Sequence, residues 1–453
     1  MDSRHVLPLG ITAILVVMFS YVVTRVAPAG VRGETVRSAM DEPASDEPGA
    51  GPAAAAEQGE SDYARELERT NAAIAAQDHL AESHGNDWAH LEGLARLYMA
   101  RAQLTGDHED YVRAQSALAR AFALAVEGAG PVLVRAQLSF TLHRLPSVEA
   151  DLAAAERAVL LRRGEREMID SLRADVAFHS GRYEEALAGF RAAHDADPHG
   201  GSAFRLALYF WQTGQLPEAE RWMQVAEATA EERGRARAWY QLQQGLMDLD
   251  RGRYDDAYAH YRRANELFTG WWLVEEHIAE VQALRGHAGE AESRYRDLIE
   301  RTGNPEFMDA LASLISDRDP AEAARWTRRA TEHYDRWLER LPEASYGHAL
   351  EHFLENGPPA RALDLAERNF ALRPGGEGSM RLAQALLLNG RCEDARVRIE
   401  AVLATVWRHA ALHATAARIY GRCGTPEQAA EQRRLGEAIH PRAMDEASFL
   451  DAE

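Results

Sequence analysis

A short phrase recurs along this chain at a nearly fixed distance. The segments SGRYEEALAGFRAAHDADP (180–198) and RGRYDDAYAHYRRANELF (251–268) share the order glycine, arginine, tyrosine, two acids and alanine. The glycine of this phrase recurs at intervals of 33, 38, 34, 71, 33 and 34 residues, at Gly181, Gly214, Gly252, Gly286, Gly357, Gly390 and Gly424. The interval of 71 holds one further unit (308–334), whose turn is Asp-Arg-Asp-Pro. A period near 34 is typical of a solenoid, so the sequence predicts a repeat array instead of several globular domains.

Each unit has the pattern of two helices joined by a tight turn. An apolar helical stretch of about 12 residues precedes the glycine, which ends the first helix where a left-handed residue is needed. Five residues later stands a small residue: Ala186, Ala219, Ala257, Ala291, Ala362, Ala395 or Ala429. Four residues further, most units have a large side chain, as in Phe190, Met223, Tyr261, Tyr295 and Ile399. The methyl group lets two antiparallel helices approach closely, and the large side chain fills the space beside the next unit.

This pattern resembles the tetratricopeptide repeat in its glycine, its alanine, the following large residue and the terminal prolines Pro198, Pro374 and Pro441. The resemblance covers about 167–443, or eight units, and implies an all-α, right-handed superhelical solenoid. Residues 63–166 are predicted to form a helical lead-in and degenerate repeats (87–125 and 133–161), and 444–453 a C-terminal tail. We therefore expect about ten hairpins, with a helix at 62–82 covering the first of them.

The resemblance also implies a function, because the first helix of each hairpin in this family lines a concave groove. The groove positions here hold Phe204, Leu208, Trp211, Trp239, Leu242, Leu246 and Leu249, followed by the acidic Glu276 and Glu280. Such an apolar wall suits an amphipathic helix or an extended peptide of a partner protein. The alternative is that these side chains pack against neighbouring repeats. We expect a non-catalytic scaffold without a cofactor; a purely structural envelope spacer is a further alternative.

One segment has the pattern of an enzyme. HALEH (348–352) places His348 and His352 one helical turn apart, with Glu351 between them, as in a zinc-dependent hydrolase. The same segment also reads as the first helix of a repeat, with Ala349, Leu350 and Phe353 in packing positions. We expect the packing role, and zinc chemistry is the alternative.

The N-terminal residues predict attachment to a membrane. Residues 6–23 are an uncharged apolar run of 18 residues, long enough for a spanning helix. We expect a retained anchor (1–25) of a bacterial protein, an acidic disordered linker rich in Pro, Ala and Gly (26–62), and an extracytoplasmic, periplasmic body. Cleavage near Ala29 and a cytoplasm-facing body are the alternatives. A net charge of −20 argues against a broad nucleic-acid surface.

The chain has two cysteines, Cys392 and Cys423, which fall at the turns of successive repeats. Two cysteines cannot form a multi-cysteine zinc site. We expect two separate thiols; a disulfide between the last two repeats is the alternative if the body faces an oxidising compartment.

Overall fold

The computed structural model describes residues 61–126, 128–157, 163–230 and 234–451, and these residues are almost entirely helical. They form 21 α-helices and one terminal 3-10 helix, and no strand occurs among them. The predicted anchor (1–25) and linker up to residue 60 lie outside the described residues. Within the described ranges, no helix has the length and apolar character that crossing a membrane requires.

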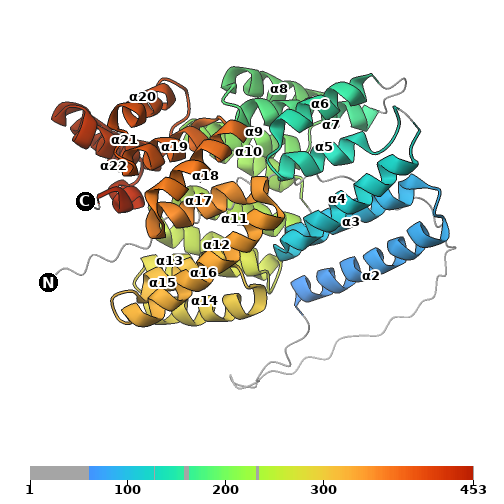
Figure 1. Cartoon of the computed structure of the whole chain (residues 1–453), viewed down its shortest axis with the longest axis horizontal. Helices are drawn as coiled ribbons and strands as arrows, with labels where there is room; N and C mark the ends of the chain where they lie inside the picture. The colour runs from blue at the N-terminus through green and yellow to red at the C-terminus, as the bar shows by residue number, and fades with distance from the viewer. Residues whose placement is uncertain (1–60, 127, 158–162, 231–233, 452–453) are drawn as a thin grey trace, which may run out of the picture.

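Helix α2 (Asp62–Ser83) packs on α3 as the predicted lead-in helix, and ten helical hairpins follow it (Figure 1). The first three hairpins are α3 (Trp88–Thr105) with α4 (His108–Leu124), α5 (Val132–Thr141) with α6 (Leu145–Glu156), and α7 (Arg163–His179) with α8 (Tyr183–Ala196). The next three are α9 (Gly200–Gln212) with α10 (Leu216–Ala228), α11 (Arg235–Leu249) with α12 (Tyr254–Leu267), and α13 (Trp272–Leu284) with α14 (Ala288–Thr302). The last four are α15 (Pro305–Ile315) with α16 (Pro320–Arg340), α17 (Pro342–Asn356) with α18 (Pro359–Leu372), α19 (Gly376–Leu388) with α20 (Cys392–Leu403), and α21 (Ala410–Cys423) with α22 (Pro426–Ile439).

The small and large side chains of the repeat pack as the sequence predicts. Six of the seven alanines are fully buried, and only Ala429, in the last hairpin, is partly exposed. The large residues Phe190, Met223, Tyr261, Tyr295 and Ile399 are buried in the same core. First helices of consecutive hairpins also contact one another, as α13, α15, α17, α19 and α21 do, and form an inner layer. The stacked hairpins are tetratricopeptide-like.

The turn glycines divide into two groups. Five adopt the left-handed conformation, with φ between 70° and 86°: Gly181, Gly214, Gly252, Gly286 and Gly390. For Gly357 and Gly424, the prediction of a left-handed turn is wrong, because their φ values are −125° and −131°. Gly357 precedes a proline, which favours extended backbone, and Gly424 leads into the extended N-cap of α22. A Cβ at either position would lie within 2.7 Å of the aromatic ring four residues earlier, so glycine is needed there for close approach.

The solenoid coils back on itself, so that later hairpins pack against earlier ones. Gly376 N donates to Tyr183 Oη (2.8 Å), Trp407 Nε1 donates to Gln212 Oε1 (3.0 Å), and an Arg144–Glu343 ion pair (3.1 Å) joins the same two layers. The partners in these contacts are 193, 195 and 199 residues apart, which corresponds to about five to six hairpins per turn of the coil. We call this interface the seam; Figure 1 shows the second turn (yellow to red) beside the first (blue to green).

The turn glycines of the first coil form part of the seam. A Cβ on Gly214 would lie 3.2 Å from Arg408 Cβ, and one on Gly252 would lie 3.3 Å from His440 Nε2. Gly286 and Gly390 occupy the equivalent turns of the second coil, and a Cβ there would meet nothing within 4 Å. The glycine at this repeat position therefore ends a helix in both coils, but only in the first coil does its lack of a side chain leave room for residues of the other coil.

A matched pair of substitutions tests the seam. Gly214→Ala and Gly390→Ala place alanine at nearly equal φ values, 73° and 70°, so both incur a similar strain of about 1–2 kcal/mol. Gly214→Ala also presses on Arg408, and we expect it to lower the free energy of unfolding by about 1 kcal/mol more. Urea denaturation of the two variants measures the difference. Equal losses would show that the two layers do not meet at this turn in solution.

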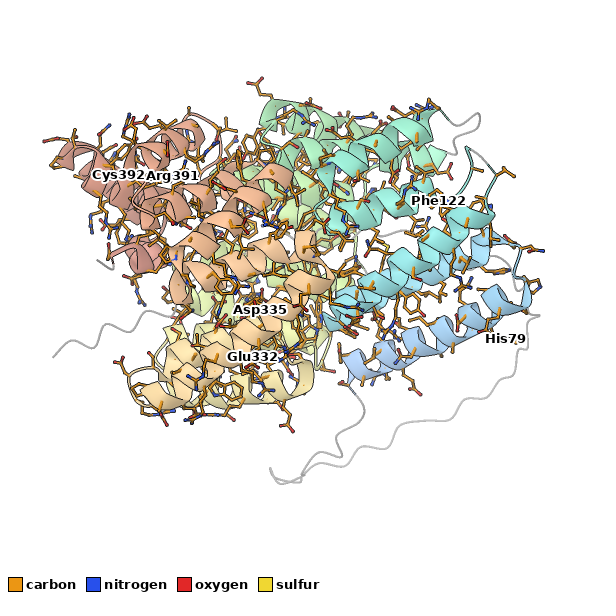
Figure 2. The ribbon with its side chains drawn as sticks, in the orientation of Figure 1. His79, Phe122, Glu332, Asp335, Arg391 and Cys392 are labelled. Carbon is orange, nitrogen blue, oxygen red and sulfur yellow. A yellow bond between two sulfur atoms is a disulfide. The ribbon has the colours of Figure 1, made fainter. Side chains whose placement is uncertain are left out.

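The last two hairpins are linked covalently. Cys392, labelled in Figure 2, begins α20, and Cys423 ends α21. The two form a disulfide with Cα atoms 5.6 Å apart. The expectation of two separate thiols is therefore wrong: the stacking of α20 on α21 brings the two ends together. Beyond α22, the 3-10 helix η2 (Ala443–Asp451) packs against α21 and covers the end of the array.

Candidate functional site

The predicted groove residues lie in the interior of the coil. The structure buries all nine, with at most 6% of any side chain exposed: Phe204, Leu208, Trp211, Trp239, Leu242, Leu246, Leu249, Glu276 and Glu280. Their helices, α9, α11 and α13, are the first helices of three consecutive hairpins, and rings of neighbouring hairpins pack on one another, as Phe204 does on Trp239 and Trp239 on Trp271. The wall therefore offers almost no exposed surface to a partner. The apolar residues of the wall contribute to the main core in the described conformation.

The His-x-x-Glu-His segment lies on α17, and each of its polar residues is held by a different neighbour. His348 Nδ1 donates to Glu306 Oε1 (2.6 Å), and His352 lies between Asp309 (2.9 Å) and Thr331 Oγ1 (2.8 Å). These contacts fit the packing interpretation, because partners from α15 and α16 satisfy the two imidazoles. Glu351 pairs with an arginine of α19, Arg381. Burial raises the pKa of Glu351 to about 7, although Arg381 opposes this shift.

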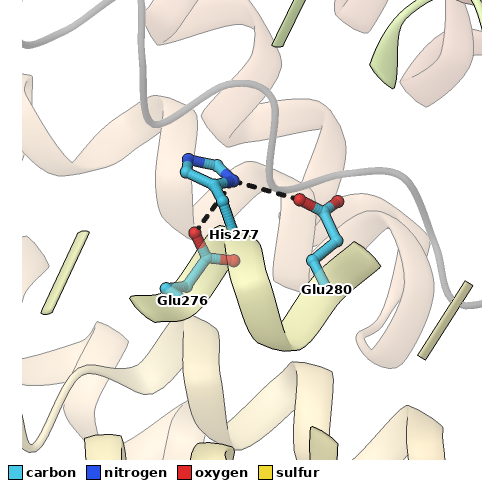
Figure 3. Close-up of side chains that lie close together, drawn as sticks. All are labelled: Glu276, His277 and Glu280. Carbon is cyan, nitrogen blue, oxygen red and sulfur yellow. Dashed lines mark hydrogen bonds and ion pairs between the residues drawn. The ribbon is translucent and has the colours of Figure 1, made fainter. Parts of the chain in front are cut away.

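The acid–histidine cluster that the structure does assemble lies on α13. His277 Nδ1 donates to Glu280 Oε2 (3.1 Å) and lies 3.1 Å from Glu276 Oε2 (Figure 3). All three side chains are at most 2% exposed. Among the described residues, this is the one group of three potential metal ligands whose ligand atoms lie within 4.8 Å of one another. We call it the α13 cluster.

Two buried tyrosines border the α13 cluster. The ring of Tyr261 stacks on the ring of His277 with centroids 5.4 Å apart, and Tyr295 comes from the paired helix α14. Burial raises the pKa of both phenols well above the usual range, and the charges of Glu276 and Glu280 add to this effect. Sequence reasoning placed Glu276 and Glu280 in the groove but missed His277. The signal was present in EEHIAE, where the two acids are four residues apart and flank the histidine.

A second feature, open to solvent, lies at the seam. A cleft of about 790 Å³ separates the turn of α3 and α4 from α14, α16 and the start of α2. Its walls carry the aromatic rings of Tyr63, Trp272 and Trp337, together with Arg301, Arg336 and Arg340. We call it the seam cleft. Figure 2 locates α16, its longest wall, by the labelled Glu332 and Asp335.

The arginines of the seam cleft differ in whether they have an acidic partner. Arg340 makes a two-pronged contact with Glu109 (2.9 and 2.7 Å), and Arg301 pairs with Glu275 and Asp297. Arg336 is exposed and has no hydrogen-bond or ion-pair partner among the described residues. Burial lowers the pKa of His108, which also lines the cleft, to about 3, and its ring lies 4.2 Å from that of Trp337.

Comparison with known proteins gives likenesses of fold. No family model matches the chain, and no curated protein matches its sequence. A tetratricopeptide repeat protein from Parabacteroides merdae is 16% identical with a TM-score of 0.34, covering 56% of this chain and 99% of its own. Pseudomonas aeruginosa pilF is 20% identical with a TM-score of 0.32, covering 53% and 98%. A human IFIT1 dimer with m7Gppp-AAAA is 13% identical with a TM-score of 0.39, covering 78% and 90%. The tetratricopeptide-like character of this chain rests on its own hairpins, turn glycines and buried alanines.

Proposed function

We propose that this chain is a non-catalytic interaction scaffold that is tethered to a membrane by its N-terminal residues and binds a segment of a partner protein in the seam cleft. The observation that carries this proposal is the cleft itself, which combines aromatic walls with an arginine that has no partner among the described residues. A volume of about 790 Å³ lies within the usual range for binding clefts. The proposal moves the binding surface from the buried inner wall to the exposed seam.

The lining of the cleft suggests the chemistry of the bound segment. Trp337 and Tyr63 offer flat apolar faces, which suit an aromatic or aliphatic side chain. Arg336 offers a planar guanidinium, which suits a carboxylate of the same segment. The other two arginines of the cleft already have acidic partners, so one carboxylate beside one apolar anchor is the complementary pattern.

The disulfide supports the compartment predicted from the sequence. Disulfides persist in the periplasm and other oxidising compartments and are rare in the cytosol. The Cys392–Cys423 link therefore supports an extracytoplasmic body. We propose that residues 6–23 hold this body at the membrane surface. Tethering would restrict partner capture to that surface.

Two arginines of α16 provide a matched test of the cleft. Arg336 lines the cleft, whereas Arg328 is exposed on the same helix, does not line the cleft and has no partner among the described residues. A photo-crosslinking amino acid at 336 in the membrane-bound full chain should capture a protein that the same probe at 328 does not capture. Arg336→Glu should weaken binding of that protein at least tenfold, which is about 1.4 kcal/mol, and Arg328→Glu should leave it unchanged.

Equal capture from both positions, or equal binding by both variants, would contradict the seam cleft as the partner site. A chain that retains its place in an envelope assembly with either variant would instead act as a structural spacer. Charged substitutions of Phe204 or Trp239 do not serve this purpose, because both residues are buried and their replacement would disrupt the core.

A further inference from the structure

We propose that Glu276, His277 and Glu280 together bind one divalent first-row transition-metal ion, such as zinc, inside the core of the coil. This site is separate from the seam cleft, and the proposal is independent of the partner-binding function. Three lines of observation carry it: the distances between the ligand atoms, the lack of other partners for them, and the charge they bring into the core.

The ligand atoms are already spaced for coordination. His277 Nδ1 lies 3.1 Å from an oxygen of each glutamate. Two ligands at metal distances of about 2.0–2.2 Å are separated by roughly 3–3.5 Å in octahedral or tetrahedral geometry. Glu276 and His277 are adjacent on α13, and Glu280 follows Glu276 by four residues, about one helical turn. One rigid helix therefore holds all three backbones in place. Imidazole nitrogen and carboxylate oxygen are donors that zinc and related divalent ions accept.

The polar atoms around the site lack other partners. Both carboxylate oxygens of Glu276, Oε1 of Glu280 and Nε2 of His277 are buried without a hydrogen-bond partner among the described residues. The hydroxyls of Tyr261 and Tyr295, which border the cluster, are also buried without a hydrogen-bond partner among the described residues. Buried polar groups are nearly always satisfied, and each unsatisfied one costs about 1–3 kcal/mol. So many unsatisfied atoms in one place indicate a ligand, and the acidic character of the cluster indicates a cation.

The charge of the site also favours a cation. Two glutamates stand beside a single histidine where all three side chains are at most 2% exposed. Elsewhere in the core, a buried acid has its own basic partner, as Asp175 has in Arg205 (2.8 Å) and Glu306 has in His348 (2.6 Å), whereas Glu276 and Glu280 share the one imidazole of His277. A divalent ion would neutralise both carboxylates of the α13 cluster and allow them to stay ionised. Its role would be structural, because the side chains that would hold it are only 0–2% exposed.

The test uses the purified full-length chain with its metal content measured by mass spectrometry. We expect about one zinc or other transition-metal ion per chain, retained during dialysis against a chelator and lost when the chain is unfolded in its presence. Glu276→Gln, which is nearly isosteric, should abolish retention. Glu351→Gln removes an acid of the His-x-x-Glu-His segment in the same core and should retain the metal, so it serves as the matched control.

Stability separates a metal site from a pair of carboxyls that share protons. If a metal is bound, wild-type protein refolded with zinc should be more stable than protein refolded with chelator, and Glu276→Gln should show no such difference. If the site holds only protons, Glu276→Gln replaces a protonated carboxyl with an amide of nearly the same shape. The variant should then be at least as stable as the wild type, whether it is refolded with zinc or with chelator. Metal-free wild-type protein with no response to zinc, or metal lost through Glu351→Gln but not Glu276→Gln, would overturn the proposal.

Discussion

Replacing Trp272 with alanine is expected to lower the free energy of unfolding by about 3–5 kcal/mol and to loosen helices α3 and α4, which are far from it in sequence. Trp272 is 4% exposed at the start of α13, and its Nε1 donates to the carbonyl oxygen of Leu104 in the last turn of α3 (2.9 Å). The ring also packs on Phe307 and beneath Gly106, where a Cβ would lie 3.0 Å from it. One side chain therefore fills the core, caps the carboxyl end of a helix and joins the two coils.

Hydrogen exchange distinguishes this effect from ordinary core damage. In an open solenoid each hairpin contacts only its neighbours, so a defect in α13 should stay near α12–α15. Through the seam, Trp272→Ala should also speed amide exchange in α3 and α4, whereas Trp272→Phe, which keeps most of the ring, should cost about 1–3 kcal/mol for the unpaired Leu104 carbonyl. Trp326→Ala is the control, because Trp326 is partly exposed and its indole donates within its own helix, to Glu322. Unchanged exchange in α3 and α4 with Trp272→Ala would show that the seam is not closed in solution.

The hairpins could be predicted from the sequence because their causes are local. A methyl group, a large side chain and a turn glycine at fixed spacing decide how two adjacent helices pack, and the buried alanines follow that spacing. Gly357 and Gly424 departed from the expected turn because the residues that follow them, a proline and an extended N-cap, favour a different backbone. That signal was also local, but the repeat pattern concealed it.

The closure of the coil could not be predicted in the same way. Whether a solenoid encloses an open groove or a filled interior depends on a small rotation per hairpin, summed over about five to six hairpins. The resulting contacts join residues almost two hundred positions apart, such as Tyr183 and Gly376, so no window of sequence contains both partners. The groove residues lie on first helices of their hairpins, and the contacts of Phe204 with Trp239 and of Trp239 with Trp271 join neighbouring hairpins, as in the alternative interpretation. The seam cleft was missed because its walls extend from Tyr63 to Leu341, a span that no window of sequence covers.

Removing the disulfide with Cys392→Ser and Cys423→Ser is expected to destabilise the C-terminal hairpins by about 3–4 kcal/mol. The cysteines are 31 residues apart, and the link restricts the unfolded chain over that loop. The region at risk includes the connection between α20 and α21, where Arg408 N donates to Gln212 O (2.9 Å) across the seam. Limited proteolysis should therefore cut the double variant first within α19–α22, and reduction of the wild-type protein should give the same pattern.

Two controls connect this stability effect to the compartment. A reducing agent should leave the double variant unchanged, because the remaining chain has no other cysteine to reduce. Thiol trapping in intact cells then reports where the body resides: an oxidised, unreactive pair supports an extracytoplasmic body, since the cytosol keeps such pairs reduced. Free thiols in the native cell, combined with a stable reduced protein, would contradict both the stabilising role of the link and the proposed location. Because the linked hairpins also carry Trp407, which contacts Gln212 of the first coil, an oxidising compartment would help to keep the seam closed.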